Sequence, residues 1–151
     1  MNFSQAKDNF YNILGDYKVM TIATSQNNKP SIRNISAIII DRRIFFKTDI
    51  NFKKTKQLLN NENVAMAYHG ISFEGKAINR GLLDKEENKF FVDLYNKYFD
   101  KSYNSYYHLD SEILIEIVPL QAEVWDQDEE YNGFQMLIDF ENKEAKRVDY
   151  D

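Results

Sequence analysis

The sequence predicts a mainly β (α+β) domain, a small antiparallel barrel flanked by helices. Its 151 residues are the size of one ordinary domain, and a hydrophobic share of 43% suffices for a core without disulfides. The chain has no internal repeat, low-complexity tract or linker, so we expect residues 1–151 to form a single domain. Strand patterns outnumber helical ones, with about seven strands and three helices, which is typical of a small barrel.

The N-terminal part combines one helix with three consecutive strands. Apolar residues recur at helical spacing over 3–14, and Gly15-Asp16 ends that helix. Turn residues then occur at Asn27-Asn28-Lys29-Pro30 and at Asp41-Arg42. Residues 18–48 are therefore expected to form a three-stranded meander. Its strand patterns lie at 19–24, 31–40 and 43–48.

The rest of the chain alternates helices with strands. A short helix is predicted at 52–60, with Asn51 as its N-cap because the side chain can accept from the first free amides. A longer helix is predicted to begin at Asp84, and a polar, aromatic loop follows at 99–110. Small barrels fill their interior with side chains, so a large ligand is expected outside the barrel, in a groove between two subunits. The remaining strand patterns lie at 63–68, 71–83, 112–125, 134–140 and 145–150, and the last two predict a terminal hairpin.

Composition excludes several classes of function. The chain has no cysteine, which rules out disulfides, zinc–thiolate sites and cysteine nucleophiles and fits a reducing, cytoplasmic compartment. It shows neither a targeting segment nor the roughly 20 apolar residues of a membrane helix. A net charge of −5 without a basic stripe argues against a nucleic-acid partner. We therefore expect neither a membrane nor a nucleic acid as partner.

The first turn of the helix predicted at 52–60 carries an unusual charge. Lys53 and Lys54 lie in that turn, and Lys56 lies just beyond it. The N-terminus of a helix is its positive end, so each lysine there is unfavourable by roughly 0.3–1 kcal/mol. A bound phosphate would reverse this effect by accepting from the free amides and pairing with the ammonium groups. The alternative is a solvated run of lysines on an exposed helix.

Arg33, Lys47 and Thr48 add polar groups near the same helix. Arg33 interrupts a strand rich in isoleucine, and its planar fork could meet a phosphate or a carboxylate bidentately. Lys47 and Thr48 end the strand that precedes the helix. Each alone has an ordinary explanation. Arg33 could be an edge-strand arginine paired with a surface carboxylate, and Lys47 and Thr48 could be ordinary residues of a turn. Because all three come from two adjacent strands, we expect them to converge with the helix on one anion.

Residues 19–69 contain several short motifs in a fixed order. These are an Ala-Thr step, a polar turn with proline, an arginine-bearing strand, a strand ending in Thr, a lysine six residues later, and a segment similar to Leu…Asn-Pro-x-Val-Ala. The order resembles the core of the FMN-binding split barrels of the pyridoxamine 5′-phosphate oxidase family. In this chain the motifs are Ala23-Thr24, Lys29-Pro30, Arg33, Thr48, Lys54, Leu58 and 61–65.

The C-terminal part is similar to the general-stress-protein branch of that family. The similarity lies in a Pro…Ala-Glu-x-Trp-Asp ending. Beyond residues 19–69, the chain otherwise resembles the family in layout only. The ending is made of Pro119, Ala122, Glu123, Trp125 and Asp126.

The resemblance implies a role for each matched residue. Arg33 would contact the FMN phosphate or ribityl region, and Lys53 and Lys54 would hold the phosphate. Lys47 and Thr48 would touch the polar edge or ribityl chain of the flavin. The family site lies between two subunits of a homodimer, so Trp125 of the partner chain would cover the ring; a buried core tryptophan is the alternative. The main-chain groups expected along the ring are those of Asn34, Ile35 and Ser36.

The chain also departs from the family pattern. Phe52 stands where the family often has a phosphate-binding serine two residues before the lysine, and Glu62-Asn63 replaces the Asn-Pro pair. True pyridoxamine 5′-phosphate oxidases carry an Arg-x-His substrate motif near the C-terminus, and this chain has no such pairing. The resemblance therefore implies FMN binding without that particular activity.

Three functions remain open at this point. The first is a flavin-dependent oxidoreductase that moves electrons from a small-molecule donor to a small-molecule acceptor. The second is a non-catalytic flavin carrier or sensor that uses the same residues. The third is a split barrel that binds another planar cofactor such as haem, for which His69 or His108 would be the axial ligand. Neither histidine has other residues at metal-ligand spacing, so no metal site is predicted.

Overall fold

The computed structural model describes residues 1–99 and 110–150, and these ranges contain eight strands, three α-helices and one short 3₁₀ helix. Most of the loop expected at 99–110, with His108, lies outside the described residues. The predicted strands agree with the structure to within about two residues at each end. The elements are α1 (Phe3–Leu14), β1 (Tyr17–Gln26), β2 (Lys29–Ile40), β3 (Arg43–Asp49), α2 (Lys53–Asn60), β4 (Asn63–Tyr68), β5 (Ile71–Leu82), η1 (Glu86–Asn88), α3 (Lys89–Tyr98), β6 (Glu112–Gln127), β7 (Gly133–Asp139) and β8 (Glu144–Asp149).

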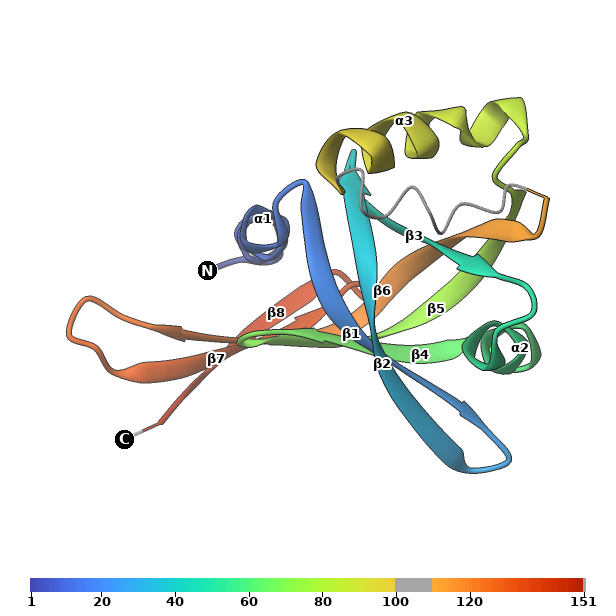
Figure 1. Ribbon diagram of the computed structural model, residues 1–151. Helices are drawn as coiled ribbons and strands as arrows, with labels where there is room; N and C mark the ends of the chain where they lie inside the picture. The colour runs from blue at the N-terminus through green and yellow to red at the C-terminus, as the bar shows by residue number, and fades with distance from the viewer. Residues whose placement is uncertain (100–109, 151) are drawn as a thin grey trace.

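Six of the strands close into an antiparallel barrel. The order is β3-β2-β1-β4-β5-β6, and β3 pairs back with β6 from Ile44↔Ile117 to Asp49↔Glu112. The hairpin β7–β8 extends the sheet beyond β6 and projects from the barrel on the side opposite α2 (Figure 1). The predicted mainly β barrel with flanking helices is confirmed.

The barrel is split between β2 and β3. β2 pairs with β1 along nearly its whole length, from Tyr17↔Ile38 to Gln26↔Lys29. In the described residues its pairing with β3 is confined to Ile38–Ile40, because β3 then turns away to pair with β6. In the described residues, 31–37 of β2 therefore pair with β1 on one side and with no strand on the other, and we call this unpaired edge the split. The β1–β2 hairpin continues from it to the lower right of Figure 1.

Two tight turns connect these strands as the sequence predicts. Asn27 and Asn28 have φ of 54° and 62°, and Asp41 and Arg42 have φ of 51° and 60°. Two consecutive residues with positive φ form the type I′ turn, whose twist matches that of the adjoining strands. Asn and Asp tolerate this conformation better than most residues, which explains why these positions end the strands.

The side chains of the barrel form two cores. The main core fills the interior and includes Ile22, Phe46 and Ile115, with Phe10 of α1 packed against its edge. The second core lies between the barrel wall and α3. β6 serves both, because alternate residues of a strand point to opposite faces. The members of the second core are Ile38, Phe45, Leu83, Phe91, Tyr95, Phe99 and Leu114.

Two predicted helix starts are wrong. Asn51 is not the N-cap of α2; the N-cap is Phe52, and no side chain caps this helix. The cause is a turn in which the Asn51 amide donates to Asp49 Oδ1 at 2.9 Å and the Phe52 amide donates to the Asp49 carbonyl at 3.0 Å. The helix predicted from Asp84 begins only at Lys89, after the 3₁₀ helix Glu86–Asn88. Within the described ranges, every helix is too short or too polar to span a bilayer.

Candidate anion-binding site

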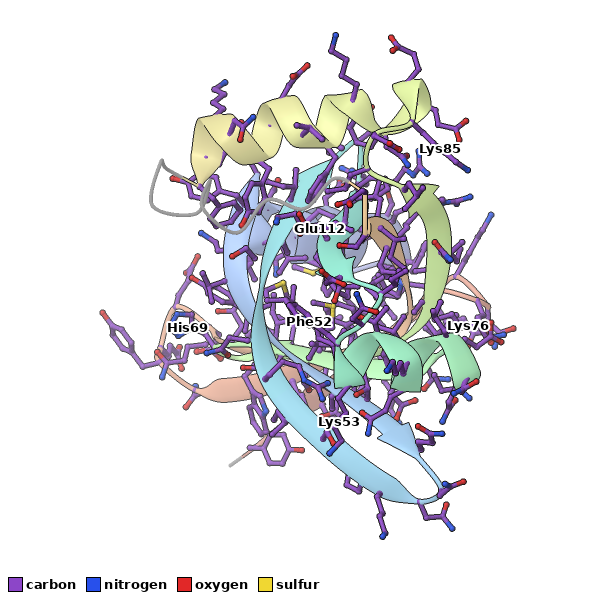
Figure 2. All side chains as sticks on the ribbon, turned by 45° about the vertical axis from the view of Figure 1, so that its right-hand side comes forward. Phe52, Lys53, His69, Lys76, Lys85 and Glu112 are labelled. Atoms are coloured by element: carbon purple, nitrogen blue, oxygen red, sulfur yellow. The ribbon has the colours of Figure 1, made fainter. Side chains whose placement is uncertain are left out.

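Helix α2 lies across one end of the barrel, next to the β1–β2 hairpin (Figure 1). Its eight residues bury Thr55, Gln57 and Leu58 and expose Lys53 and Lys56. Polar residues thus form much of its buried face. Phe52 and Lys53 lie at the N-terminal end of α2, which is its left end in Figure 2.

The first turn of α2 has backbone donors without an acceptor in the helix, and it contains no acidic residue. Its first internal hydrogen bond joins the Lys56 amide to the Phe52 carbonyl at 3.1 Å. The amides of Lys53, Lys54 and Thr55 therefore have no acceptor within the helix. No acidic residue lies in the first turn. Amides and dipole together favour an anion at this position.

Arg33 reaches this end of the barrel from β2. It shares the inner face of the strand with Ile35 and Ala37, which lie in the main core. Its Nη1 donates to Thr24 Oγ1 at 2.6 Å. Among the described residues, no carboxylate forms an ion pair with Arg33. An arginine fork with only a neutral partner remains available to a phosphate.

Lys54 lies close to two other cations. Burial lowers the pKa of its ammonium group, and the positive charges of Arg33 and Lys47 lower it further. Burial likewise lowers the pKa of the Arg33 guanidinium. Lys54 has no carboxylate ion pair within residues 1–99 and 110–150; its ammonium lies 5.5 Å from the centroid of the Phe52 ring. The positive charges of Arg33 and Lys47 thus act on Lys54, and we call these three residues the cation cluster; their convergence on one anion remains a prediction.

Lys47 differs from the other two cations because it has a buried partner. Its Nζ lies 2.5 Å from Glu112 Oε2, and the two side chains are only 8% and 6% exposed. The ammonium also lies over the Tyr95 ring of α3, at 5.0 Å from the centroid. Glu112 lies on the α3 side of Phe52 in Figure 2. The sequence contained no signal that paired Lys47 with Glu112 across 65 positions.

Thr48 points to the opposite face of β3. Its hydroxyl lies 2.7 Å from Thr55 Oγ1, which in turn donates to the Asp49 carbonyl at 2.6 Å. Because a hydroxyl has one proton, Thr48 must be the donor to Thr55. Thr48 therefore anchors α2 to β3. Its predicted contact with a ligand remains a prediction, as does that of Lys53, whose side chain is exposed.

The three residues after Arg33 border the split between β2 and β3. Asn34 is exposed and accepts from Thr21 Oγ1 at 3.1 Å, Ile35 is buried in the core, and Ser36 is half-buried. In an antiparallel strand, the N–H and C=O of alternate residues point to alternate sides. The Ile39 amide donates toward β1, to the Asp16 carbonyl at 2.8 Å. By this alternation, the main-chain groups of Asn34 and Ser36 point into the split.

Trp125 lies far from the cation cluster in the same chain. It pairs with Gln135 of β7, and its ring packs on Tyr150 with centroids 4.9 Å apart. α2 and the β7–β8 hairpin are on opposite sides of the molecule (Figure 1). The side chain is 50% exposed, so the alternative prediction of a core tryptophan is wrong. Trp125 could meet the cation cluster only as part of a second chain.

A groove of about 750 Å³ crosses the outer face of the sheet. Its walls come from the two projecting hairpins and from β4, β5 and β6 between them. None of the nine residues predicted to bind the cofactor lines it. Ile32, whose neighbour Arg33 belongs to the cation cluster, lines the groove and is 71% exposed. The groove and the Arg33 side chain thus lie on opposite faces of the same hairpin.

The histidine considered as a haem ligand lies apart from this site. His69 is in the turn between β4 and β5, with φ of 49° and its ring 4.3 Å from that of Tyr68. Figure 2 shows it well separated from Phe52 and Lys53. In the part of the chain that the structure describes, no three His, Asp or Glu residues are grouped as metal ligands.

Sequence reasoning missed two residues that hold Arg33. Thr24 and Gln57 are both buried and form a hydrogen-bonded chain from Arg33 to Ser31. A signal for Thr24 existed, because it follows Met20 and Ile22 at a spacing of two and must share their inward face. Gln57 had no such signal, since a glutamine on a short helix is usually exposed.

Comparison of the sequence with known proteins identifies a family model and a curated relative. The family model described as pyridoxamine 5′-phosphate oxidase matches residues 6–126. The pyridoxine/pyridoxamine 5′-phosphate oxidase of Pelagibacter ubique (strain HTCC1062) is 33% identical over 85 residues, which are 55% of this chain and 41% of that enzyme. The match thus spans less than half of the relative's length.

Solved structures share the fold at low identity. A pyridoxamine 5′-phosphate oxidase-related, FMN binding protein from Nostoc punctiforme PCC 73102 has a TM-score of 0.64 and 11% identity, over 99% of this chain and 93% of that one. General Stress Protein 26 from Bacillus anthracis str. Sterne has a TM-score of 0.59 and 22% identity, over 78% and 92%. The family model, in contrast, extends from α1 to the end of β6 and matches most of the sequence. The chain therefore belongs to the pyridoxamine 5′-phosphate oxidase family, with the split-barrel fold of its solved members.

Proposed function

We propose that this protein binds FMN and that the phosphate lies at the N-terminus of α2, between Arg33 and Lys54. The observation that carries the proposal is the cation cluster itself. The positive charges of Arg33 and Lys47 both act on Lys54, while Arg33 and Lys54 are partly desolvated and have no carboxylate ion pair in the described residues. Such an arrangement is electrostatically unfavourable unless an anion occupies it. The three free amides of α2 add donors for the same oxygens.

The split between β2 and β3 suits the flat ring of a flavin. Main-chain groups of Asn34 and Ser36 border it and could bind the polar edge of the ring. Lys47 belongs to the cation cluster, but its ammonium group is held in place by the ion pair with Glu112. Its positive charge would therefore act on the flavin from a fixed position. Bound FMN would supply two-electron redox chemistry, while the residues of the chain bind and orient it.

The charge of the site favours FMN over FAD and riboflavin. A phosphomonoester carries close to two negative charges at neutral pH, which matches the Arg33 guanidinium and the Lys54 ammonium. Riboflavin has no phosphate, and the diphosphate of FAD continues into an adenosine group. The FMN binding relative from Nostoc punctiforme is consistent with this choice.

A second copy of the chain would complete the site. Trp125 lies too far from the cation cluster to cover a flavin bound by the same chain. The outer groove, which the exposed Ile32 lines, offers a surface for a partner subunit on the opposite face of the hairpin from Arg33. We therefore propose a homodimer in which the flavin lies at the interface and Trp125 of the partner chain approaches its ring.

We propose a flavin-dependent oxidoreductase with small-molecule donor and acceptor, and a non-catalytic flavin carrier or sensor as the second candidate. The chain lacks an Arg-x-His pairing, which argues against oxidation of pyridoxamine 5′-phosphate. Anaerobic addition of NADH or NADPH separates the two candidates. Bleaching of the flavin, reversed by an acceptor, supports the enzyme, whereas a flavin that stays oxidised with every donor supports the carrier.

Ligand titration tests the proposal directly. Apo protein should bind FMN at least about 100-fold more tightly than riboflavin, because two charge-assisted contacts contribute roughly 1.5–3 kcal/mol each. FAD should bind more weakly than FMN. Flavin fluorescence measures the affinities, and sedimentation equilibrium measures whether the mass is twice 17.9 kDa. Equal affinity for FMN and riboflavin, or a Soret band with added haem and no flavin uptake, would contradict the FMN site.

The affinity for FMN is also expected to fall at alkaline pH. The pKa of Lys54 is lowered in the free protein by burial and by Arg33 and Lys47, and a bound phosphate raises it again. Below the lowered pKa, Lys54 is charged in both states and contributes fully to binding. Above it, the free protein has lost the proton, which binding must restore, so affinity declines with rising pH.

Titrations from about pH 7 up to the ordinary lysine pKa of about 10.4 measure this decline, because the pKa of Lys54 is lowered from that value. Riboflavin is titrated over the same pH interval, and because it has the same ring without the phosphate, its pH dependence corrects for ionisation of the flavin ring. Lys54→Arg serves as the control variant, because a guanidinium remains charged over the whole interval. A decline of the same size in Lys54→Arg would show that Lys54 is not the titrating group.

A further inference from the structure

Arg33 is one end of a hydrogen-bonded chain that crosses the end of the barrel. Its Nη1 donates to Thr24 Oγ1 at 2.6 Å, and Thr24 Oγ1 lies 2.6 Å from Gln57 Oε1. Gln57 Nε2 then donates to Ser31 Oγ at 3.3 Å. The chain joins β2 to β1, β1 to α2, and α2 back to β2. Three elements thus determine where the guanidinium lies.

The direction of each hydrogen bond follows from the chemistry of the groups. A guanidinium can only donate, so Thr24 must accept from Arg33 and give its single proton to Gln57. This in turn places the carbonyl oxygen of the Gln57 amide toward Thr24 and its nitrogen toward Ser31. The chain therefore has one arrangement of protons, and it cannot be reversed.

Thr24 and Gln57 are buried where apolar residues would be expected. They are only 2% and 5% exposed, and Ile22 and Leu58 beside them lie in the main core. A core built from apolar side chains of the same shape is usually at least as stable as one with buried polar groups. The two polar side chains are therefore explained better by what they do to Arg33 than by packing.

We propose that Thr24 and Gln57 are positioning residues that hold the Arg33 guanidinium ready for a phosphate, an inference that rests on the proposed FMN site. A free arginine side chain loses about 2 kcal/mol of rotamer entropy when it is fixed in one position. Fixing Nη1 beforehand removes part of that loss from the binding step. Nη2 and Nε, which have no hydrogen bond to another described residue, remain for the ligand.

The test separates a positioning role from a structural one. Thr24→Val keeps the shape of the side chain and removes the hydroxyl, and Gln57→Met removes the next member of the chain, the acceptor of the Thr24 hydroxyl. Both should lower FMN affinity about 10-fold, the effect of one hydrogen bond to a charged group. Riboflavin affinity should change less than about 2-fold, because riboflavin has no phosphate. Thr24→Ser, which retains the hydroxyl, should restore FMN affinity.

Ser25→Ala is the matched control. Ser25 Oγ accepts from Asn61 Nδ2 at 3.1 Å, a second link between β1 and α2 that does not touch Arg33. Its removal should leave the ratio of FMN to riboflavin affinity unchanged. Thermal melting of every variant shows how far each has lost stability. Equal losses of FMN and riboflavin affinity in Thr24→Val would overturn the positioning role.

Inorganic phosphate keeps this test independent of the flavin. Phosphate should raise the melting temperature of the apo protein, and Thr24→Val should reduce that rise. If wild type binds phosphate but not FMN, the proposed function fails while the role of Thr24 is still decided by phosphate. If wild type binds neither, Arg33 is no anion-binding group and the inference fails as well.

Discussion

An Arg33→Glu variant is expected to bind FMN at least about 100-fold more weakly than wild type. The substitution removes a charge-assisted, bidentate partner of the phosphate and places a carboxylate beside it. Removal alone corresponds to roughly 1.5–3 kcal/mol, and repulsion at close range adds to it. The carboxylate would also pair with Lys54, which would lose its free charge. Fluorescence titration with FMN measures the effect.

Lys56→Glu is the control for this charge reversal. It changes the net charge by the same amount and lies on α2, the helix of the proposed phosphate site, but the Lys56 side chain is exposed and is not part of the cation cluster. Its FMN affinity should stay within about 3-fold of wild type, because exposed charges are screened by salt. Equal losses in the two variants would mean that overall charge, and not Arg33, determines binding.

Replacing Glu112 by alanine is expected to lower the free energy of unfolding by about 3–5 kcal/mol, because it leaves the buried Lys47 ammonium without its carboxylate. The double variant Lys47→Met/Glu112→Leu should recover most of that loss, since apolar residues of similar volume can replace a buried ion pair. Urea denaturation measures both. A loss below about 1 kcal/mol in Glu112→Ala would place the pair among exposed salt bridges.

The same double variant separates the two roles considered for Lys47. If Lys47 only supports the fold, the double variant regains stability and binds FMN as wild type does. If its charge also acts on the flavin, the variant regains stability but binds FMN more weakly. Stability and affinity are therefore measured on the same preparations.

Local patterns predicted most of the barrel. Alternation along β1 and β6, and the turn residues at Asn27-Asn28 and Asp41-Arg42, determine strands and turns through contacts between near neighbours. The start of α2 was misplaced because Asp49 forms a turn with Asn51 and Phe52, and that turn depends on the position of β3 in the barrel. Propensity at Asn51 alone does not contain this information.

The candidate site was predicted in part. An electrostatic effect of Arg33 and Lys47 on Lys54 was expected from two adjacent strands and the next helix, and burial and this effect both lower the pKa of Lys54; that the three bind one anion remains a prediction. Alternation could have shown that Lys47 and Thr48 point to opposite faces of β3, and so do not meet one ligand group together. Glu112 could not be predicted, because its pairing with Lys47 arises only when β6 returns to β3. The roles of the nine residues toward FMN remain predictions.

The closing of the barrel by β3 and β6 also has a consequence for folding. Two ion pairs join β3 to β6 across this seam. Lys47 and Glu112 are 65 positions apart in the sequence, and Arg43 and Glu116 are 73 apart. The hydrogen bonds among Thr24, Ser31, Arg33 and Gln57 span at most 33 positions. Longer loops cost more entropy to close, and distant pairings slow folding. The seam is therefore the high-contact-order part of the molecule. The residues of the anion site lie almost wholly within the segment 24–57. Only Glu112, the carboxylate partner of Lys47, comes from β6, the strand that closes the barrel.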